Sequence, residues 1–228
     1  MSPETRRFHA VLRGYAERND GTIALWGDSL KMDYTALFAE VAYRQQRLSD
    51  AGVKVVALAL DNGVDAMLWD LAVLFEGLTC LTLPPFFSPA QRAHCLAQSH
   101  AELVIAEPEL AGELRDAGYH QAGEFWRRSF TGRPALPLDT AKITFTSGTT
   151  GAPKGVCLSA DSLLRVAREL HQASHVTDPR HHLALLPIAI LLENLGCYAA
   201  LYAGATLSVP SQKTLGIQGA SAVDAAQL

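Results

Sequence analysis

The chain has 228 residues, of which 49% are hydrophobic and 18% charged, and its formal net charge is −4. This composition is typical of a folded globular protein and excludes a disordered one. The small negative charge gives no support to nucleic-acid binding, which normally goes with a basic excess.

The N-terminal part predicts two helices around a short hairpin. Ser2 is a suitable cap for a first helix with apolar residues at helical spacing. Residues 22–26 and 30–32 flank a turn and predict a hairpin. Asp33 can cap a second helix, which we expect to end near Gly52.

The middle of the chain alternates between strand-like and helix-like segments. Strands are predicted at 53–60, 78–83 and 103–106, and helices at 64–76, 88–99 and 108–116. This alternation implies an α/β fold of layered, mostly parallel sheets flanked by helices.

Residues 127–139 hold two prolines, a glycine and three arginines, which is typical of a surface connection. We expect this segment to separate a first α/β subdomain, residues 1–126, from a second subdomain, of which residues 140–228 are the first part. In this second part a strand and a loop come first. They are followed by a helix over 160–174, a strand at 182–186, a helix at 193–203 and a strand at 205–209.

The loop after residue 145 has the chemistry of a polyphosphate site. Its glycines let backbone N–H groups approach an anion, its hydroxyls are uncharged donors, and its lysine is a mobile cation. The candidate binding residues are Thr146, Ser147, Gly148, Thr149, Thr150, Gly151 and Lys154. A flexible linker has a similar composition, but apolar runs flank this loop closely. It is not a P-loop, because Gly155 rather than Ser or Thr follows Lys154.

Residues 145–156 read Phe-Thr-Ser-Gly-Thr-Thr-Gly-Ala-Pro-Lys-Gly-Val. This stretch resembles the phosphate-loop signature of the adenylate-forming (AMP-binding) enzymes, which include acyl-CoA synthetases, firefly luciferases and peptide-synthetase adenylation domains. The resemblance implies ATP and Mg²⁺ as cofactors, with the loop closing over the β- and γ-phosphates while a carboxylate attacks the α-phosphorus. It also implies an acyl-adenylate product and coenzyme A as the expected acceptor.

Residues 186–194 resemble a segment of the long-chain fatty acyl-CoA synthetases. The resemblance implies a carboxylic acid substrate, with a long-chain fatty acid as the candidate, and substrate contacts from Ile190 and Glu193. Ile190 stands where the long-chain enzymes usually have histidine, so the polarity of the pocket stays open. Glu193 matches the long-chain glutamate, but an acid favoured by a helix N-terminus is an equal alternative. Aryl-acid, amino-acid and luciferase-type ligases share the same loop.

The family's later motifs, including its C-terminal catalytic lysine, have no counterpart up to Leu228. The resemblance therefore covers an incomplete N-terminal domain. We expect no catalytic residue in this chain and no activity from it alone, whereas the parent protein is expected to be an acid–thiol ligase. A non-catalytic remnant that binds nucleotide or a partner is the alternative. In either case, we expect an incomplete domain to expose apolar surface that favours self-association.

Other groups of residues give weaker indications of function. The histidines at 171, 175, 181 and 182 are irregularly spaced, so no metal site is expected. Ser147 is no hydrolase nucleophile, since Phe145 stands where the motif needs glycine. No signal peptide or spanning segment is apparent. The four cysteines form no C-x-x-C pair, which favours free thiols in a reducing cytoplasm.

Overall fold

The computed structural model describes residues 1–132, 136–146, 153–218 and 222–223. Its α-helices are α1 (Pro3–Arg18), α2 (Tyr34–Ala51), α3 (Val64–Glu76), α4 (Pro89–Ser99), α5 (Ala111–Asp116), α6 (Ala160–Ser174) and α7 (Leu191–Tyr202). Short 3₁₀ helices are η1 (Pro108–Leu110) and η2 (His175–Thr177). The strands are β1 (Ile23–Trp26), β2 (Lys31–Asp33), β3 (Val55–Ala59), β4 (Thr79–Thr82), β5 (Leu103–Ala106), β6 (His120–Ala122), β7 (Phe125–Arg127), β8 (Thr140–Thr146), β9 (Lys154–Ser159), β10 (His181–Leu183), β11 (Thr206–Ser208), β12 (Ile217–Gln218) and β13 (Ala222–Val223).

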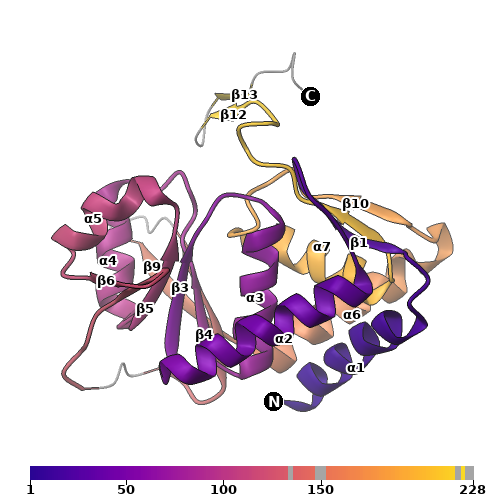
Figure 1. Cartoon of the computed structure of the whole chain (residues 1–228), viewed down its shortest axis with the longest axis horizontal. Helices are drawn as coiled ribbons and strands as arrows, with labels where there is room; N and C mark the ends of the chain where they lie inside the picture. The colour runs from indigo at the N-terminus through magenta and orange to yellow at the C-terminus, as the bar shows by residue number, and fades with distance from the viewer. Residues whose placement is uncertain (133–135, 147–152, 219–221, 224–228) are drawn as a thin grey trace.

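The described strands form a seven-stranded sheet, a four-stranded sheet and a two-stranded ribbon (Figure 1). The seven-stranded sheet has the order β6-β7-β5-β3-β4-β8-β9, and β5, β3, β4 and β8 run parallel. The four-stranded sheet, β10-β11-β1-β2, joins strands from distant parts of the sequence. The predicted α/β class with mostly parallel sheets is confirmed.

Strand β3 shows how the seven-stranded sheet divides the core. Val56 and Leu58 belong to a core shared with α1, α2, α3, α6 and α7, whereas Val55 and Ala57 pack in a second core with α4 and α5. Figure 1 shows these two groups of helices on opposite sides of β3. Successive strand side chains point to opposite faces, so a strand covered on both sides is apolar throughout.

The predicted helix starts are confirmed by capping bonds. Ser2 accepts from the N–H of Thr5, and Asp33 accepts from that of Ala36. Ser88 and Gln91 form a complete capping box at α4. Each cap satisfies a backbone donor that has no partner within its own helix.

Some features differ from the prediction. The β6–β7 hairpin and the β12–β13 ribbon were not predicted, because strands of two or three residues carry too little alternation to be recognised. The strand predicted at 182–186 ends at Leu183, and residues 184–190 form an irregular connection. The division at 127–139 stays a prediction, and strands from both sides of it share each of the two larger sheets. Among the described residues, none of the helices has the length and apolar character needed to span a bilayer.

Candidate functional site

The candidate phosphate loop connects β8 to β9, which pair as an antiparallel hairpin at the edge of the seven-stranded sheet. Thr146 ends β8, Lys154 begins β9, and the two residues are paired across the base of the loop. Both are exposed. The hairpin thus presents a hydroxyl and an ammonium together to solvent. The other predicted residues, Ser147, Gly148, Thr149, Thr150 and Gly151, lie outside the described residues.

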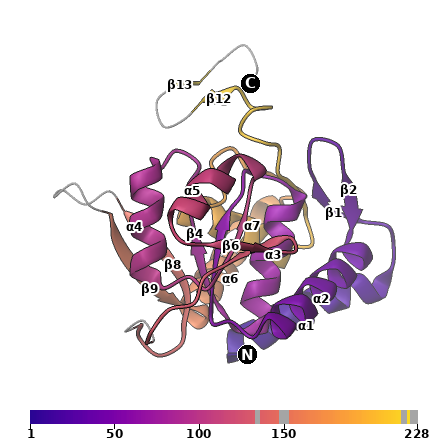
Figure 2. The same ribbon diagram turned by 60° about the vertical axis from the view of Figure 1, so that its left-hand side comes forward.

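Packing beneath the hairpin explains why residue 155 is glycine. A Cβ placed on Gly155 would lie 3.1 Å from Cζ of Phe145 and 3.3 Å from Cγ2 of Ile143. The missing side chain lets the Phe145 ring lie across β9. His94 of α4 donates from Nε2 to the carbonyl oxygen of Pro153 at 3.1 Å, and Figure 2 shows α4 beside the hairpin. A hydrogen bond from the neighbouring helix α4 therefore fixes the start of the strand that carries Lys154.

The connection that contains Ile190 is clamped by buried polar side chains. Asn62 donates from Nδ2 to the carbonyl oxygen of Leu186 at 2.9 Å, and its Oδ1 accepts from the N–H of Ile188 at 2.8 Å. Thr82 donates to the carbonyl oxygen of Ala189 at 3.0 Å. These bonds attach the irregular connection to Asn62, which lies three residues after the end of β3, and to Thr82, the last residue of β4.

The two predicted substrate residues lie on either side of the start of α7. Ile190 precedes the helix, is half-buried, and donates its N–H to the carbonyl oxygen of Pro187 at 2.8 Å. Glu193 lies in the first helical turn and is 9% exposed. Its carboxylate accepts from His182 Nε2 at 2.9 Å and from the N–H of Leu186 at 3.0 Å. A contact of either residue with a substrate stays a prediction.

A buried charged network, which the sequence analysis missed, joins the hairpin strand to α7. The Lys142 ammonium lies 2.6 Å from Asp70 Oδ1 and 2.7 Å from Asn194 Oδ1. Tyr198 donates its hydroxyl proton to Asp70, and Asn194 donates to Asp70 Oδ2 at 3.1 Å. Lys142 and Asp70 are each 2% exposed. The sequence did offer a signal, because Asp70 interrupts the apolar residues 66–75 of α3 and Lys142 is the one charged residue of β8.

Electrostatics in this network favours the ion pair. Burial by itself raises the pKa of Asp70, but the Lys142 charge and hydrogen bonds from Lys142, Tyr198 and Asn194 outweigh it and lower the pKa below 3.8. Burial and the Asp70 charge hold the pKa of Tyr198 well above its usual value. Asp70 is therefore an anion, and Tyr198 a neutral donor, at neutral pH.

A cavity of about 950 Å³ opens near the carboxyl ends of β3, β4 and β5. Ligands of open α/β sheets commonly bind at such an edge. Its wall combines apolar residues with four acids, Asp28, Asp61, Glu107 and Glu109, and two cations, Arg92 and Lys213. The acids outnumber the cations, which disfavours an anionic ligand, so the cavity is not assigned to the acid substrate.

Known proteins resemble this chain in both sequence and fold. The model of the family described as AMP-binding enzyme matches residues 12–224. Phosphinothricin tripeptide synthetase PhsC of Streptomyces viridochromogenes is 29% identical over 188 residues, which are 77% of this chain and 17% of that protein. Surfactin synthase subunit 2 of Bacillus subtilis is 27% identical over 179 residues, which are 73% of this chain and 5% of that protein.

Solved structures share the fold. The crystal structure of VinN superposes with a TM-score of 0.74 at 18% identity, over 89% of this chain and 59% of VinN. The o-succinylbenzoate coenzyme A synthetase MenE from Bacillus subtilis, in complex with AMP, gives a TM-score of 0.68 at 20% identity, over 89% of this chain and 55% of MenE. The chain spans less than two thirds of the length of each of these relatives.

Proposed function

Because this chain belongs to the AMP-binding enzyme family, we propose that the protein containing it activates a carboxylic acid with ATP. The products of this step are an acyl-adenylate and pyrophosphate. The observation that carries the proposal is the β8–β9 hairpin, which places Thr146 opposite Lys154 at the base of a loop rich in glycine and hydroxyl residues.

The donors of the hairpin fit a polyphosphate. The Lys154 ammonium is an exposed cation that can neutralise a phosphate oxygen, and the Thr146 hydroxyl is a donor without charge. ATP, when bound, would supply the adenylyl group that makes the acid reactive. The described strands of the hairpin contain no carboxylate, so no ligand for Mg²⁺ is assigned.

The acid is proposed at the level of its class. Structures of VinN with L-aspartate and with 3-methylaspartate, and of MenE with the acyl-adenylate OSB-AMP, support a carboxylic or amino acid. The resemblance to long-chain enzymes has no support among these relatives, so a long-chain fatty acid is only one member of the panel to be tested. The acceptor is proposed to be coenzyme A, with a carrier protein as the alternative.

The test is carboxylate-dependent exchange of pyrophosphate into ATP, measured with amino, aryl, short-chain and long-chain acids. We expect one acid class to support exchange by the protein containing this chain. Lys154→Ala should lower that exchange about 100-fold, since it removes a cation expected to neutralise the pyrophosphate leaving group. Lys54→Ala is the matched control, because Lys54 is exposed and precedes β3, far along the chain from the hairpin.

The same assay separates the alternatives. Absence of exchange with every acid, together with saturable ATP binding that Lys154→Ala weakens, would favour a non-catalytic nucleotide-binding protein. Exchange that is unaffected by Lys154→Ala would contradict the assigned role of the hairpin. Exchange by the 228-residue chain alone would overturn the expectation that it is inactive.

A further inference from the structure

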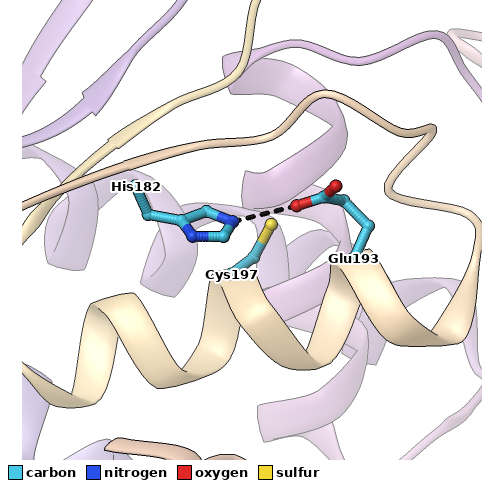
Figure 3. A group of neighbouring side chains, drawn as sticks. All are labelled: His182, Glu193 and Cys197. Carbon is cyan, nitrogen blue, oxygen red and sulfur yellow. Dashed lines mark hydrogen bonds and ion pairs between the residues drawn. The ribbon is translucent and has the colours of Figure 1, made fainter. Parts of the chain in front are cut away.

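A mixed set of potential metal ligands lies between β10 and α7, outside the hairpin described above. His182 of β10, Glu193 and Cys197 of α7 each offer one ligand atom, and these three atoms lie within 4.8 Å of one another. Figure 3 shows the His182 ring pointing at Glu193, with the Cys197 sulfur close to both. Glu193 and Cys197 are four residues apart, so they project from the same face of α7.

The surroundings hold these groups in place. The N–H of Leu186 donates to Oε2 of Glu193 at 3.0 Å, while Oε1 is the oxygen that faces His182 at 2.9 Å. A Cβ on Gly196 would lie 3.1 Å from Cε1 of His182. A glycine here thus leaves room for the imidazole against the helix. Backbone donors that orient a ligating carboxylate are typical of the outer shell of metal sites.

The charges and the access also fit a divalent cation. Cys197 is fully buried, and burial followed by the Glu193 charge raises the pKa of its thiol, so without a metal the thiol keeps its proton. A bound M²⁺ would displace that proton, and one thiolate with one carboxylate would neutralise its charge. His182 and Gly196 line a surface cavity of about 280 Å³, so the cluster adjoins this cavity on its His182 side.

We propose that His182, Glu193 and Cys197 form a binding site for a zinc-like divalent metal, with a water molecule from the adjoining cavity as fourth ligand. Nitrogen, oxygen and thiolate donors together match Zn²⁺ or Co²⁺ and disfavour Mg²⁺, so the site is distinct from any magnesium bound with ATP. Tetrahedral bonds of about 2.0–2.3 Å place neighbouring ligand atoms roughly 3.3–3.8 Å apart. Nε2 of His182 and Oε1 of Glu193, which are 2.9 Å apart, would therefore separate to admit the ion. The bound metal would tie β10 to the first two turns of α7.

The experiment is a titration of the full metal-free chain with Co²⁺, followed by visible and near-ultraviolet absorption. We expect one equivalent to give the intense visible bands of four-coordinate cobalt and a thiolate-to-cobalt charge-transfer band. Cys197→Ser should remove the charge-transfer band, and His182→Gln should weaken binding at least tenfold. His181→Gln and Cys157→Ser are matched controls, because His181 is bonded to Ser208 and Cys157 lies on β9.

Circular dichroism of the metal-free variants establishes that each is folded.

A second test uses the unmutated chain and so does not depend on how any variant folds. The X-ray absorption spectrum of its zinc form should show one sulfur atom among the zinc ligands. A cobalt spectrum without a charge-transfer band, or a zinc form with only nitrogen and oxygen ligands, would overturn the proposal. Binding that survives in Cys197→Ser with the band intact would also overturn it. Neither readout depends on ATP or on an acid, so this result is independent of the proposed ligase activity.

Discussion

At the scale of single residues, the pair formed by Lys142 and Asp70 dominates the interior. Their charged atoms are 2.6 Å apart and are almost fully excluded from solvent. Desolvating two ions costs several kcal/mol, and only good geometry and further hydrogen bonds offset it. Asn194 and Tyr198 provide these bonds. A buried pair of this kind adds little net stability, and its bonds join β8 to α3 and α7.

Removal of one partner should be much more damaging than removal of both. We expect Lys142→Met to lower the free energy of unfolding by about 3–5 kcal/mol, since it leaves a buried carboxylate without its cation. The double variant Lys142→Met/Asp70→Asn should recover at least about 2 kcal/mol of that loss, because it carries neither charge. Urea unfolding of the single and double variants measures this coupling. Strictly additive losses would show that the ion pair is not energetically coupled.

The same carboxylate predicts an acid dependence of stability. The pKa of Asp70 is lower in the folded chain than its usual 3.8, so the unfolded chain takes up a proton first as pH falls. Its stabilising contribution is thus complete above the unfolded pKa and is lost as pH falls through the folded pKa, with a slope approaching about 1.4 kcal/mol per pH unit. Urea midpoints between pH 6 and pH 3 should fall more steeply for the natural chain than for Lys142→Met/Asp70→Asn. Parallel profiles would exclude Asp70 as the group responsible.

At the scale of elements, irregular residues 184–190 depend on bonds from other parts of the chain. Asn62 is 6% exposed and satisfies both a carbonyl and an N–H of this connection. Regular helices and strands satisfy such groups internally, whereas a partly buried connection requires side chains. The start of α7, with Ile190 and Glu193, is positioned by these contacts.

Asn62→Ala should therefore destabilise the chain by about 2 kcal/mol and speed hydrogen exchange at the Ile188 amide, which loses its acceptor. Thr82→Val is the matched comparison, because it removes one bond to the same connection, to the carbonyl of Ala189, and keeps the side-chain volume. We expect its effect on stability to be about half as large. Equal rates of hydrogen exchange at the Ile188 amide in Asn62→Ala and in the natural chain would contradict the assigned role of Asn62 in holding this connection.

At the scale of the whole molecule, the two larger sheets are covered differently. Helices pack on both faces of the seven-stranded sheet, but the four-stranded sheet has one outer face on which Trp26, Ser208 and Leu183 form a row. Trp26 is 42% and Leu183 48% exposed. Parallel strands are normally covered on both faces, which is consistent with the expected self-association.

We predict that a second copy covers this outer face at high protein concentration. Light scattering should give a mass above that of the monomer, and Leu183→Lys should shift it toward the monomer. Val176→Lys is the control, because Val176 is 93% exposed but lies on η2 rather than on the sheet face. A monomer at every concentration would contradict the prediction.

The sequence by itself determined most of the local elements and the family. Caps such as Ser2, Asp33 and Ser88, and the apolar runs of β3 and α3, act between residues close in the chain, so their physics can be recognised from spacing alone. The loop signature likewise lies in one continuous stretch. Only the tertiary structure decided which distant residues meet. Asp70 and Lys142 are 72 positions apart in the chain. Asn62 forms hydrogen bonds with Leu186 and Ile188, which are separated from it by 124 and 126 positions. No local periodicity encodes such contacts, because they arise from how helices and strands pack together.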